Sequence, residues 1–511
     1  MNSQQKITPS STSQRRWSWL WLALGALGTG LCSGKYTLIV GPWLLGIFLL
    51  RFVIIQRPWI RWGAFVGTVS VAFFISQLNF NPLPIKIFSV SSLINGLLMY
   101  LPFFLHVKLS HRLPTLFSTL VFPSATVALE LLFSAGPFGS WGSFAYTQYA
   151  NLPFVQLASI TGIWGITFLI TWSTSVINLL WEHDWKTPTL RPTLMALGLS
   201  LASVHVYGIV QLTITPKNGE EIRISGVARS KSEDKPQRKA LRSWRALDEK
   251  SEAEREEIWQ EQNNSYNTLF ERSHAEALAG SKIIVWNEWA ALVSKEYEQR
   301  LIKRGAEFAK KHSIYLGMGI ANILPQNKLL LENKLVLISP SGEIASEYLK
   351  TKIVPGEPCV AGTEGLQYSD TEFGRISSSV CFDNDFQDLI RNAGANQTNL
   401  HLAPSNDWLE IQSEHNIMAA FRAIENGFTV LRPTSNGISS IIDPNGRVKN
   451  QASAFDHEWP TTSAIVSLAR KSTLYSKYGD WFSYVSVAMI IALTAIALLK
   501  KKHRWNSVND I

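Results

Sequence analysis

The distribution of charged residues along the chain constrains its fold more than any other feature. Between Trp62 and Trp181 only four residues carry a charge: Lys86, Lys108, Arg112 and Glu130. Charged residues become frequent from Lys217 onward. The 511 residues are also too many for one ordinary domain. The sequence therefore predicts an apolar block followed by a water-soluble one.

The apolar block contains segments long enough to cross a bilayer, which takes about 20 apolar residues in a helix. The first follows Arg15 and Arg16, as in a signal peptide, but no small-residue cleavage site comes after it. We therefore expect an uncleaved first helix in a bundle of eight spans: 17–34, 36–54, 62–79, 91–109, 116–136, 156–181, 193–212 and 481–500.

Basic residues in the loops predict the orientation of these spans, because cytoplasmic loops are enriched in Lys and Arg. With the N-terminus inside, the inner loops hold Arg57, Arg61, Lys108, Arg112, Lys186 and Arg191, whereas the outer loops hold only Lys35 and Lys86. The expected order is a cytoplasmic N-terminus (1–16), seven helices (17–212), an extracytoplasmic domain (213–480), a last helix (481–500) and a cytoplasmic tail (501–511).

Composition argues against two classes of function. The net charge of +9 comes largely from short loops and the tail Lys500–Arg504, so we do not expect nucleic acid to be a partner. The three cysteines form no CxxC or Cys/His cluster, which argues against a zinc site. The sequence also has no Gly-rich phosphate loop and no HExxH, and we expect no metal and no cofactor.

Two features of the apolar block have open interpretations. Glu130 lies in the fifth span, where an acid can be functional or can make a structural hydrogen bond. The loop 136–142 is uncharged and rich in glycine and aromatic residues, and it faces the same side as the soluble domain. It could guide lipid, although an interfacial aromatic belt is the simpler interpretation.

The soluble block alternates short apolar runs with amphipathic segments, which predicts an α/β layered fold. Helices are expected at 250–279, 296–312 and 412–426, and a loop at 229–250. Strands are expected at 222–227, 282–286, 314–320, 334–338, 376–382, 399–403, 429–432 and 438–443.

Three residues near the ends of these strands are candidates for chemistry: Glu288, Lys350 and Cys381. If they belong to one sheet, they can converge at its edge, but periodicity alone does not show this. A buried cysteine is more often inert, Glu288 could be a solvated loop acid, and Lys350 could be a surface lysine. Cys359 and Cys381 could also form a disulfide in an oxidising compartment.

The three segments resemble the nitrilase superfamily, and nearly the whole chain resembles the bacterial apolipoprotein N-acyltransferases. The family's Trp-Pro-Glu corresponds to Trp286-Asn287-Glu288, and its Cys-Tyr-Glu to Cys381-Phe382-Asp383. Its Tyr-x-Lys motif, which ends in Gly-Glu, corresponds to Tyr348, Lys350, Gly356 and Glu357 and is one residue shorter here. Further matches are Ser405-Asn406-Asp407, Arg422, Glu425, Gly427, Ser435-Asn436-Gly437, Glu130, Trp141, Tyr146 and Gln156-Leu157-Ala158.

This resemblance implies a four-layer αββα domain with a Glu288–Lys350–Cys381 triad, and Glu357 and Phe382 in supporting roles. It implies acyl transfer from a membrane phospholipid, through a Cys thioester, to the N-terminal amine of a diacylglyceryl apolipoprotein. The location implied is the bacterial inner membrane, with the catalytic domain on the periplasmic face. A membrane-anchored amidase or hydrolase is the alternative, and a scaffold with a decayed site is disfavoured by the intact triad.

The chain also departs from the family pattern at several positions near the site. Asn287 replaces a proline beside Glu288, Phe382 lacks the hydroxyl of a tyrosine, and no aromatic residue precedes Gly356. Trp408 and Leu409 replace a small and an aromatic residue. These departures bear on the acceptor rather than on the triad.

Overall fold

The computed structural model describes residues 12–32, 34, 36–78, 80–183, 190–213, 221–230, 241–247, 250–324, 327 and 330–506. The chain divides into two compact units. The first comprises Met1–Thr213 and Tyr478–Ile511, and the second comprises Ile214–Lys477.

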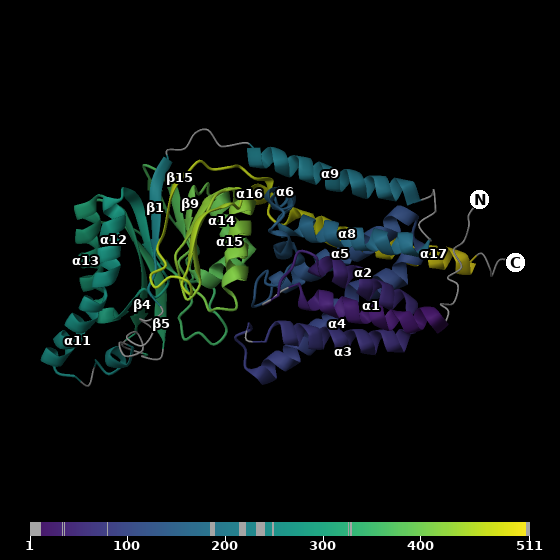
Figure 1. Cartoon of the computed structure of the whole chain (residues 1–511), viewed down its shortest axis with the longest axis horizontal. Helices are drawn as coiled ribbons and strands as arrows, with labels where there is room; N and C mark the ends of the chain where they lie inside the picture. The colour runs from purple at the N-terminus through teal and green to yellow at the C-terminus, as the bar shows by residue number, and fades with distance from the viewer. Residues whose placement is uncertain are drawn as a thin grey trace. The chain divides into compact units, whose positions relative to one another are not determined.

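The first unit is a helical bundle (Figure 1). Its long helices are α1 (Thr12–Gly30), α2 (Gly41–Ile55), α3 (Pro58–Ser76), α4 (Ile85–Leu109), α5 (Thr115–Ser134), α8 (Ile163–Glu182), α9 (Arg191–Thr213) and α17 (Trp481–Asn506). In the described part of the chain, 6 helical segments are long and apolar enough to cross a membrane: Pro58–Ser76, Ile85–Arg112, Thr115–Ser134, Ile163–Glu182, Arg191–Thr213 and Trp481–Leu499.

The expected number of eight spans is therefore not confirmed. Helix α2 is apolar but has only 15 residues, which is short for a bilayer crossing. Helix α1 has 19 residues, but its first turns carry Arg15 and Arg16 among other polar residues, so it falls outside the set of six.

The expected span 156–181 is interrupted near its start. A short helix α7 (Ala158–Thr161) ends at Gly162, whose φ of 64° lies in the left-handed region, and α8 begins at the next residue. Glycine adopts this conformation without the steric cost that a Cβ atom brings. The glycine therefore separates two helices where hydropathy alone predicts one.

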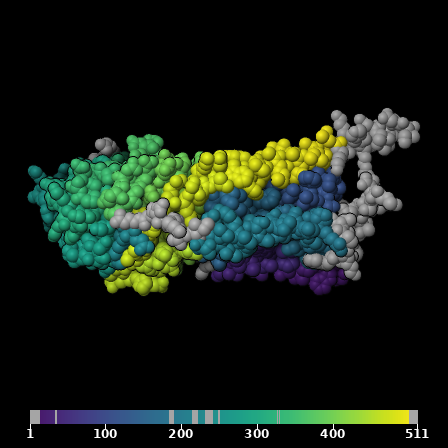
Figure 2. Space-filling model, turned by 90° about the horizontal axis from the view of Figure 1, so that it is seen from above, coloured from purple at the N-terminus to yellow at the C-terminus, as the bar shows by residue number. Residues whose placement is uncertain are grey.

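The C-terminal helix α17 packs against α5 within the bundle. A cluster of buried apolar side chains joins them: Leu109, Val121, Ala125, Ile490, Leu493 and Ala497. Figure 2 shows α17 in yellow along the outside of the bundle. The last helix therefore belongs to the same unit as the N-terminal helices.

The second unit contains two large sheets and a small one. One large sheet has the order β15 (Thr462–Ser467), β1 (Glu221–Val227), β2 (Ser281–Trp286), β4 (Tyr315–Ile323), β5 (Leu331–Ile338) and β6 (Ile344–Leu349), with β3 (Ala291–Ser294) also paired to β4. The other has the order β14 (Val448–Ser453), β13 (Ile438–Ile442), β11 (Thr429–Arg432), β9 (Leu400–Leu402), β8 (Gly374–Ser378) and β7 (Gln367–Thr371). Strands β10 (Ser405–Asn406) and β12 (Thr434–Ser435) form a short parallel pair.

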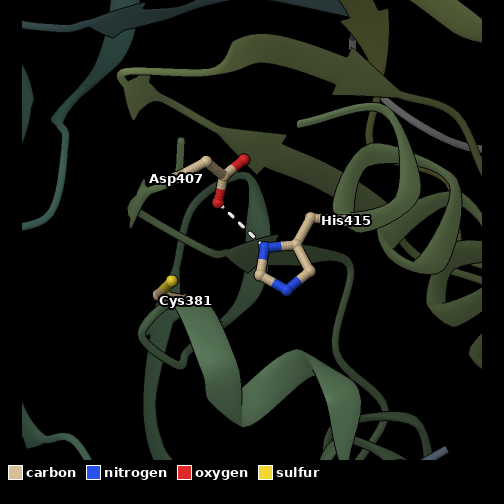
Figure 3. A group of neighbouring side chains, drawn as sticks. All are labelled: Cys381, Asp407 and His415. Atoms are coloured by element: carbon tan, nitrogen blue, oxygen red, sulfur yellow. Dashed lines mark hydrogen bonds and ion pairs between the residues drawn. The ribbon is translucent and has the colours of Figure 1, made fainter. Parts of the chain in front are cut away.

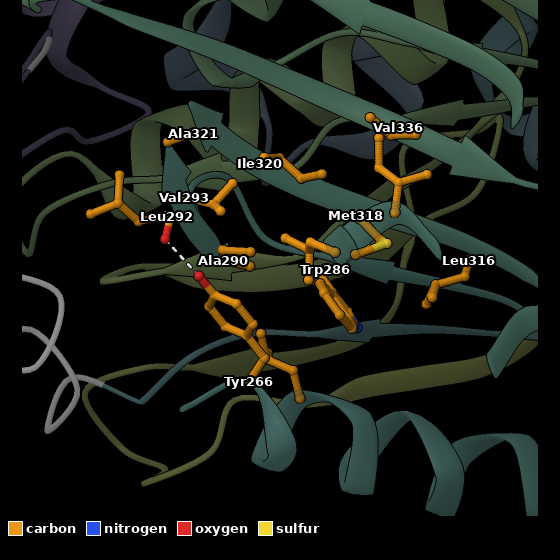
Figure 4. Packing of buried hydrophobic residues seen from close by; sticks show 14 of the residues in the cluster. Tyr266, Trp286, Ala290, Leu292, Val293, Leu316, Met318, Ile320, Ala321 and Val336 are labelled. Atoms are coloured by element: carbon orange, nitrogen blue, oxygen red, sulfur yellow. Dashed lines mark hydrogen bonds between the residues drawn. The ribbon is translucent and has the colours of Figure 1, made fainter. Parts of the chain in front are cut away.

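Helices flank the sheets of this unit (Figure 1). Helices α12 (Asn267–Leu278) and α13 (Glu298–His312) lie on one side, and α14 (Gln387–Ala395) and α15 (Gln412–Asn426) on the other. Figure 4 shows apolar side chains of the first sheet, such as Trp286 and Met318, packed into a continuous core. Burial of this apolar surface is the main stabilising contribution to the fold.

Three expectations for this unit need correction. The helix expected at 250–279 is divided into α11 (Glu252–Ser265) and α12 at Tyr266, whose N–H donates to the Asn263 carbonyl three residues back instead of continuing the i−4 pattern of an α-helix. The strand expected at 376–382 ends at Ser378, and a 3-10 helix, Cys381–Asp385, follows. The expected loop 229–250 is helical at 241–245 with Trp244 buried, while 231–240 and 248–249 lie outside the described residues.

Candidate active site

A buried lysine lies between two glutamates in the second unit. Lys350 directly follows β6, and its Nζ lies 2.9 Å from Glu288 Oε1 and 2.8 Å from Glu357 Oε2. Glu288 belongs to the turn after β2, and Glu357 belongs to the segment after Lys350. Glu288 and Lys350 follow strands of the same sheet and are in contact, whereas Cys381 follows β8 of the other large sheet, so the three candidates do not share one sheet edge.

Asn333 joins the same cluster, and the sequence analysis missed it. Its Nδ2 donates to Glu288 Oε1 at 2.6 Å and to Glu357 Oε1 at 3.2 Å. Asn333 is fully buried in β5, a strand whose later residues are apolar. Asn333 lies one residue before the strand expected at 334–338, so no local pattern marked it as a buried partner of the two glutamates.

Cys381 starts the 3-10 helix after β8 in a strained conformation. Its φ of 49° is unusual for a residue with a side chain, and such strain is concentrated at functional sites. Its N–H donates to the Pro404 carbonyl at 2.9 Å, and its Sγ contacts the Asn406 carbonyl at 3.8 Å. The thiol is buried, and the charges of Glu288 and Lys350 both reach it.

Burial and charge set the protonation of these groups. Burial raises the pKa of the Cys381 thiol well above its ordinary value, Glu288 raises it further, and Lys350 lowers it. Burial also raises the pKa of Glu288, against the effect of Lys350. Burial alone would lower the pKa of Lys350, but Glu288, Cys381 and Glu357 hold it well above its ordinary value. The site therefore suits a thiol that ionises when a neighbouring base removes its proton.

Asp383 connects the lysine segment to the cysteine turn. Its Oδ1 accepts the backbone N–H groups of Thr351 and Lys352, and its Oδ2 accepts the Val380 N–H and the Tyr348 hydroxyl. Burial raises the pKa of Asp383 to about 6, although these donors favour its ionised form. This carboxylate therefore fixes the spacing between Lys350 and Cys381.

Lys350 and Lys352 have different surroundings. The Lys352 Nζ lies 4.5 Å from the centre of the Phe386 ring rather than in the carboxylate cluster. Phe382 packs edge-on against the same ring, with centroids 5.3 Å apart. Phe382 therefore lies beside Cys381 as part of an aromatic contact.

The alternative of a Cys359–Cys381 disulfide is wrong for this structure. All three cysteines are free thiols. The Cys359 thiol instead donates to Glu357 Oε1 at 3.5 Å.

A second charged group lies next to the thiol. Figure 3 shows Cys381 near Asp407 and His415, and one candidate ligand atom from each lies within 4.8 Å of the others. Asp407 accepts both Arg432 Nη2 and His415 Nδ1 at 2.9 Å, and His415 Nε2 lies 3.3 Å from Asp385. Because both imidazole nitrogens face carboxylates and Asp407 holds an arginine, the cluster suits an ion-pair network better than a metal.

In the first unit, Glu130 has a structural explanation. Its carboxylate accepts hydrogen bonds from the Phe144 N–H at 3.0 Å, Ser143 Oγ at 2.9 Å and Thr167 Oγ1 at 2.8 Å. The Ser140 and Tyr146 hydroxyls lie 2.6 Å apart in the same loop. Glu130 therefore fixes the glycine- and aromatic-rich loop to the helices. This favours a structural role for Glu130 over a functional one.

Comparison with known proteins gives two matches along the chain. Residues 42–176 match the family model "Apolipoprotein N-acyltransferase N-terminal domain", and residues 258–473 match "Carbon-nitrogen hydrolase". An apolipoprotein N-acyltransferase from Geobacter metallireducens is 27% identical over 391 residues, covering 71% of this chain and 70% of the relative. Apolipoprotein N-acyltransferase 1 from Treponema denticola is 24% identical over 548 residues, covering 94% of this chain and 96% of the relative.

Solved structures include an amidase from Nesterenkonia sp., which is 17% identical and covers 53% of this chain and 98% of its own, with a TM-score of 0.41.

The two large sheets with their flanking helices, together with the carbon–nitrogen hydrolase match, define the second unit as nitrilase-like. The matches in both units and the named relatives then identify the family. The chain belongs to the apolipoprotein N-acyltransferases of the nitrilase superfamily.

Proposed function

We propose that this protein transfers an acyl chain from a membrane phospholipid, through a thioester on Cys381, to the N-terminal amine of the lipidated cysteine of apolipoproteins. The observation that carries the proposal is the buried Lys350 ammonium, held between Glu288 and Glu357 within electrostatic reach of the Cys381 thiol. The family and the names of its relatives supply the class of substrate.

The first half-reaction acylates the cysteine. Glu288 takes the thiol proton, and the thiolate attacks the ester carbonyl of the phospholipid to form a C–S bond. Lys350 and a backbone N–H near Phe382 stabilise the oxyanion. The C–O bond then breaks, and the lysophospholipid leaves with the proton from Glu288.

The second half-reaction moves the acyl chain to the acceptor. The amine of the lipidated cysteine attacks the thioester carbonyl and gives its proton to Glu288. A C–N bond forms, the C–S bond breaks, and the Cys381 thiolate regains the proton. Glu357 assists by holding Lys350 in place, and Asn333 donates to both carboxylates. The chemistry proceeds without a metal or a nucleotide.

The proposed setting is the bacterial inner membrane. We retain the arrangement of eight crossings, with α1 and α2 as the first two, both termini in the cytoplasm and residues 213–480 on the periplasmic face as a four-layer αββα domain. The six long apolar helices and the bias of Lys and Arg between loops support this proposal.

The second candidate is a membrane-anchored amidase or hydrolase, which the carbon–nitrogen hydrolase match favours. The two candidates differ in what resolves the thioester, because a transferase must exclude water until the amine arrives.

Incubation with phospholipid alone separates them. We expect a long-lived acyl-enzyme and one stoichiometric burst of lysophospholipid. A diacylated lipopeptide with a free amine should then discharge the acyl-enzyme, and its N-acetylated control should not. Continuous release of fatty acid without an amine would instead identify a hydrolase.

A further inference from the structure

Asn287 occupies the turn between β2 and Glu288, and its side chain makes three hydrogen bonds. The Oδ1 accepts the Arg229 N–H at 2.9 Å, and the Nδ2 donates to the Glu288 carbonyl at 2.6 Å and to Ser435 Oγ at 2.9 Å. The residue is 1% exposed. A backbone N–H on one side and a backbone carbonyl on the other allow only one orientation of the amide.

The backbone around Asn287 is also held tightly. Its N–H donates to the Val227 carbonyl at the end of β1, and its carbonyl accepts the Ala290 N–H, both at 3.2 Å. A Cβ atom on Gly319 of β4 would lie 2.0 Å from this carbonyl oxygen, so only glycine fits there. Trp289 completes the turn with a φ of 57°, which is strained for a bulky side chain. The turn that carries Glu288 therefore has little freedom to shift.

The third bond of the Asn287 amide reaches the strand that pairs with the segment in contact with the thiol. Ser435 lies in β12, which pairs with β10. The next residue, Asn436, donates its Nδ2 to Asn406 Oδ1 at 3.1 Å, and the Asn406 carbonyl contacts Cys381 Sγ. A short chain of polar contacts thus runs from the turn of Glu288 to the side of Cys381.

We propose that Asn287 is a positioning residue that fixes the Glu288 turn of one sheet to the Ser435–Asn436 segment, which holds Asn406 against Cys381. Glu288 and Cys381 come from different large sheets, so their relative position depends on contacts between the sheets. The amide supplies such a contact one residue from the proposed base. The inference rests on the proposed role of Glu288 as the base for Cys381.

The isosteric change Asn287→Asp separates hydrogen bonding from shape. A carboxylate keeps an acceptor for the Arg229 N–H but places oxygen against the Glu288 carbonyl and has no donor for Ser435 Oγ. It should therefore perturb the turn at least as much as Asn287→Ala. The change Ser435→Ala removes one bond and is the milder variant.

The experiment measures the single-turnover rate of acyl-enzyme formation by the full-length protein with phospholipid in detergent micelles. We expect Asn287→Ala to slow acylation by about tenfold to 10²-fold, with the half-saturating phospholipid concentration nearly unchanged, because small displacements of reacting groups have effects on this scale. The melting temperature should also fall, because the Arg229 N–H, the Glu288 carbonyl and Ser435 Oγ lose this buried partner. Ser435→Ala should slow it by about threefold to tenfold, the scale of one hydrogen bond.

A double-mutant comparison distinguishes positioning from a general structural role. If Asn287 acts through Glu288, adding Asn287→Ala to Glu288→Gln should slow acylation by less than about twofold more. A full additional loss, or a wild-type rate for Asn287→Ala, would overturn the proposal. If Asn287→Ala does not fold, Ser435→Ala decides: slower acylation at an unchanged melting temperature supports the proposal, and a wild-type rate contradicts it.

Failure of the proposed function has a different signature, since the wild-type protein would then form no acyl-enzyme from phospholipid. In that case, acylation of Cys381 by a p-nitrophenyl ester would serve as the probe in place of phospholipid. The same variants would be compared, and the same changes in rate would support or overturn the role of Asn287.

Discussion

The Lys350 ammonium is shared by two carboxylates, and this sharing defines the site at the scale of single residues. Removing one member of such a group leaves uncompensated buried charge as well as a missing reactant. Asn333 extends the group, because its amide donates to both glutamates.

Substitution of the triad should remove activity. Cys381→Ala should abolish transfer, and Glu288→Gln and Lys350→Ala should each lower turnover by at least about 10²-fold, the scale of losing a general base or an oxyanion partner. Lys352→Ala is the matched control, because its ammonium lies over Phe386 outside the carboxylate cluster. The assay is acyl transfer to a fluorescent lipopeptide; a loss with Lys352→Ala but not with Lys350→Ala would reject the assignment.

Removal of the Asn333 amide should change the pH dependence. Burial raises the pKa of Glu288, and the hydrogen bond from Asn333 lowers it. Glu288 acts as a base only when ionised, so activity falls as pH decreases through its pKa. In Asn333→Leu the acidic limb of the kcat/KM profile should move to higher pH, and an unchanged limb would mean that Glu288 is not the titrating base.

At the scale of the elements, the buried central strands could be predicted better from the sequence than the strands at the edges of the sheets. The expected ranges 222–227, 282–286 and 429–432 correspond closely to β1, β2 and β11. In β2 the apolar run Ile283–Trp286 indicates a strand buried on both faces, whereas in β1 apolar residues alternate with Arg223 and Ser225. Strands β6 and β14 were missed, since each has a single buried residue and reads as polar loop.

The same limit applied to the site. Glu288 and Lys350 became candidates through their resemblance to family motifs, although β6, the strand before Lys350, was itself missed. The roles of Asn333 and Asn287 could not be predicted, because a hydrogen bond across 45 residues or between sheets leaves no local pattern.

His415 connects two elements beside Cys381, namely the end of its 3-10 helix at Asp385 and the segment at Asp407. Burial lowers the pKa of His415, but the two aspartates raise it to about 9. The folded pKa exceeds the unfolded value of about 6.5, so this stabilisation is fully present below pH of about 6.5 and is lost as pH rises through about 9. The melting-temperature difference between wild type and His415→Gln should therefore shrink from pH 6 to pH 10; a constant difference would show that the imidazole is neutral.

At the scale of the whole molecule, the division into a helical unit and an α/β unit follows from the distribution of charge along the chain. The first unit takes its last helix from the C-terminus, so the α/β unit is connected to it at both ends. Hydropathy was less informative about the number of crossings, because α1 and α2 are marginal in composition or length.

Membrane topology is testable with single cysteines in a background that lacks Cys32, Cys359 and Cys381. We expect Ala240→Cys to react with an impermeant maleimide added to spheroplasts, and Trp505→Cys to react only after the membrane is permeabilised. Reaction of both residues from the same side would contradict the proposed orientation.

The central claim is that Cys381 carries the acyl group during transfer. Peptide mass spectrometry of protein quenched in acid after incubation with a phospholipid of defined chains tests it directly. We predict one acyl chain on the peptide with Cys381, sensitive to hydroxylamine, retained in Cys359→Ser and absent in Cys381→Ser. An acyl chain on another residue, or transfer that continues in Cys381→Ser, would contradict the account.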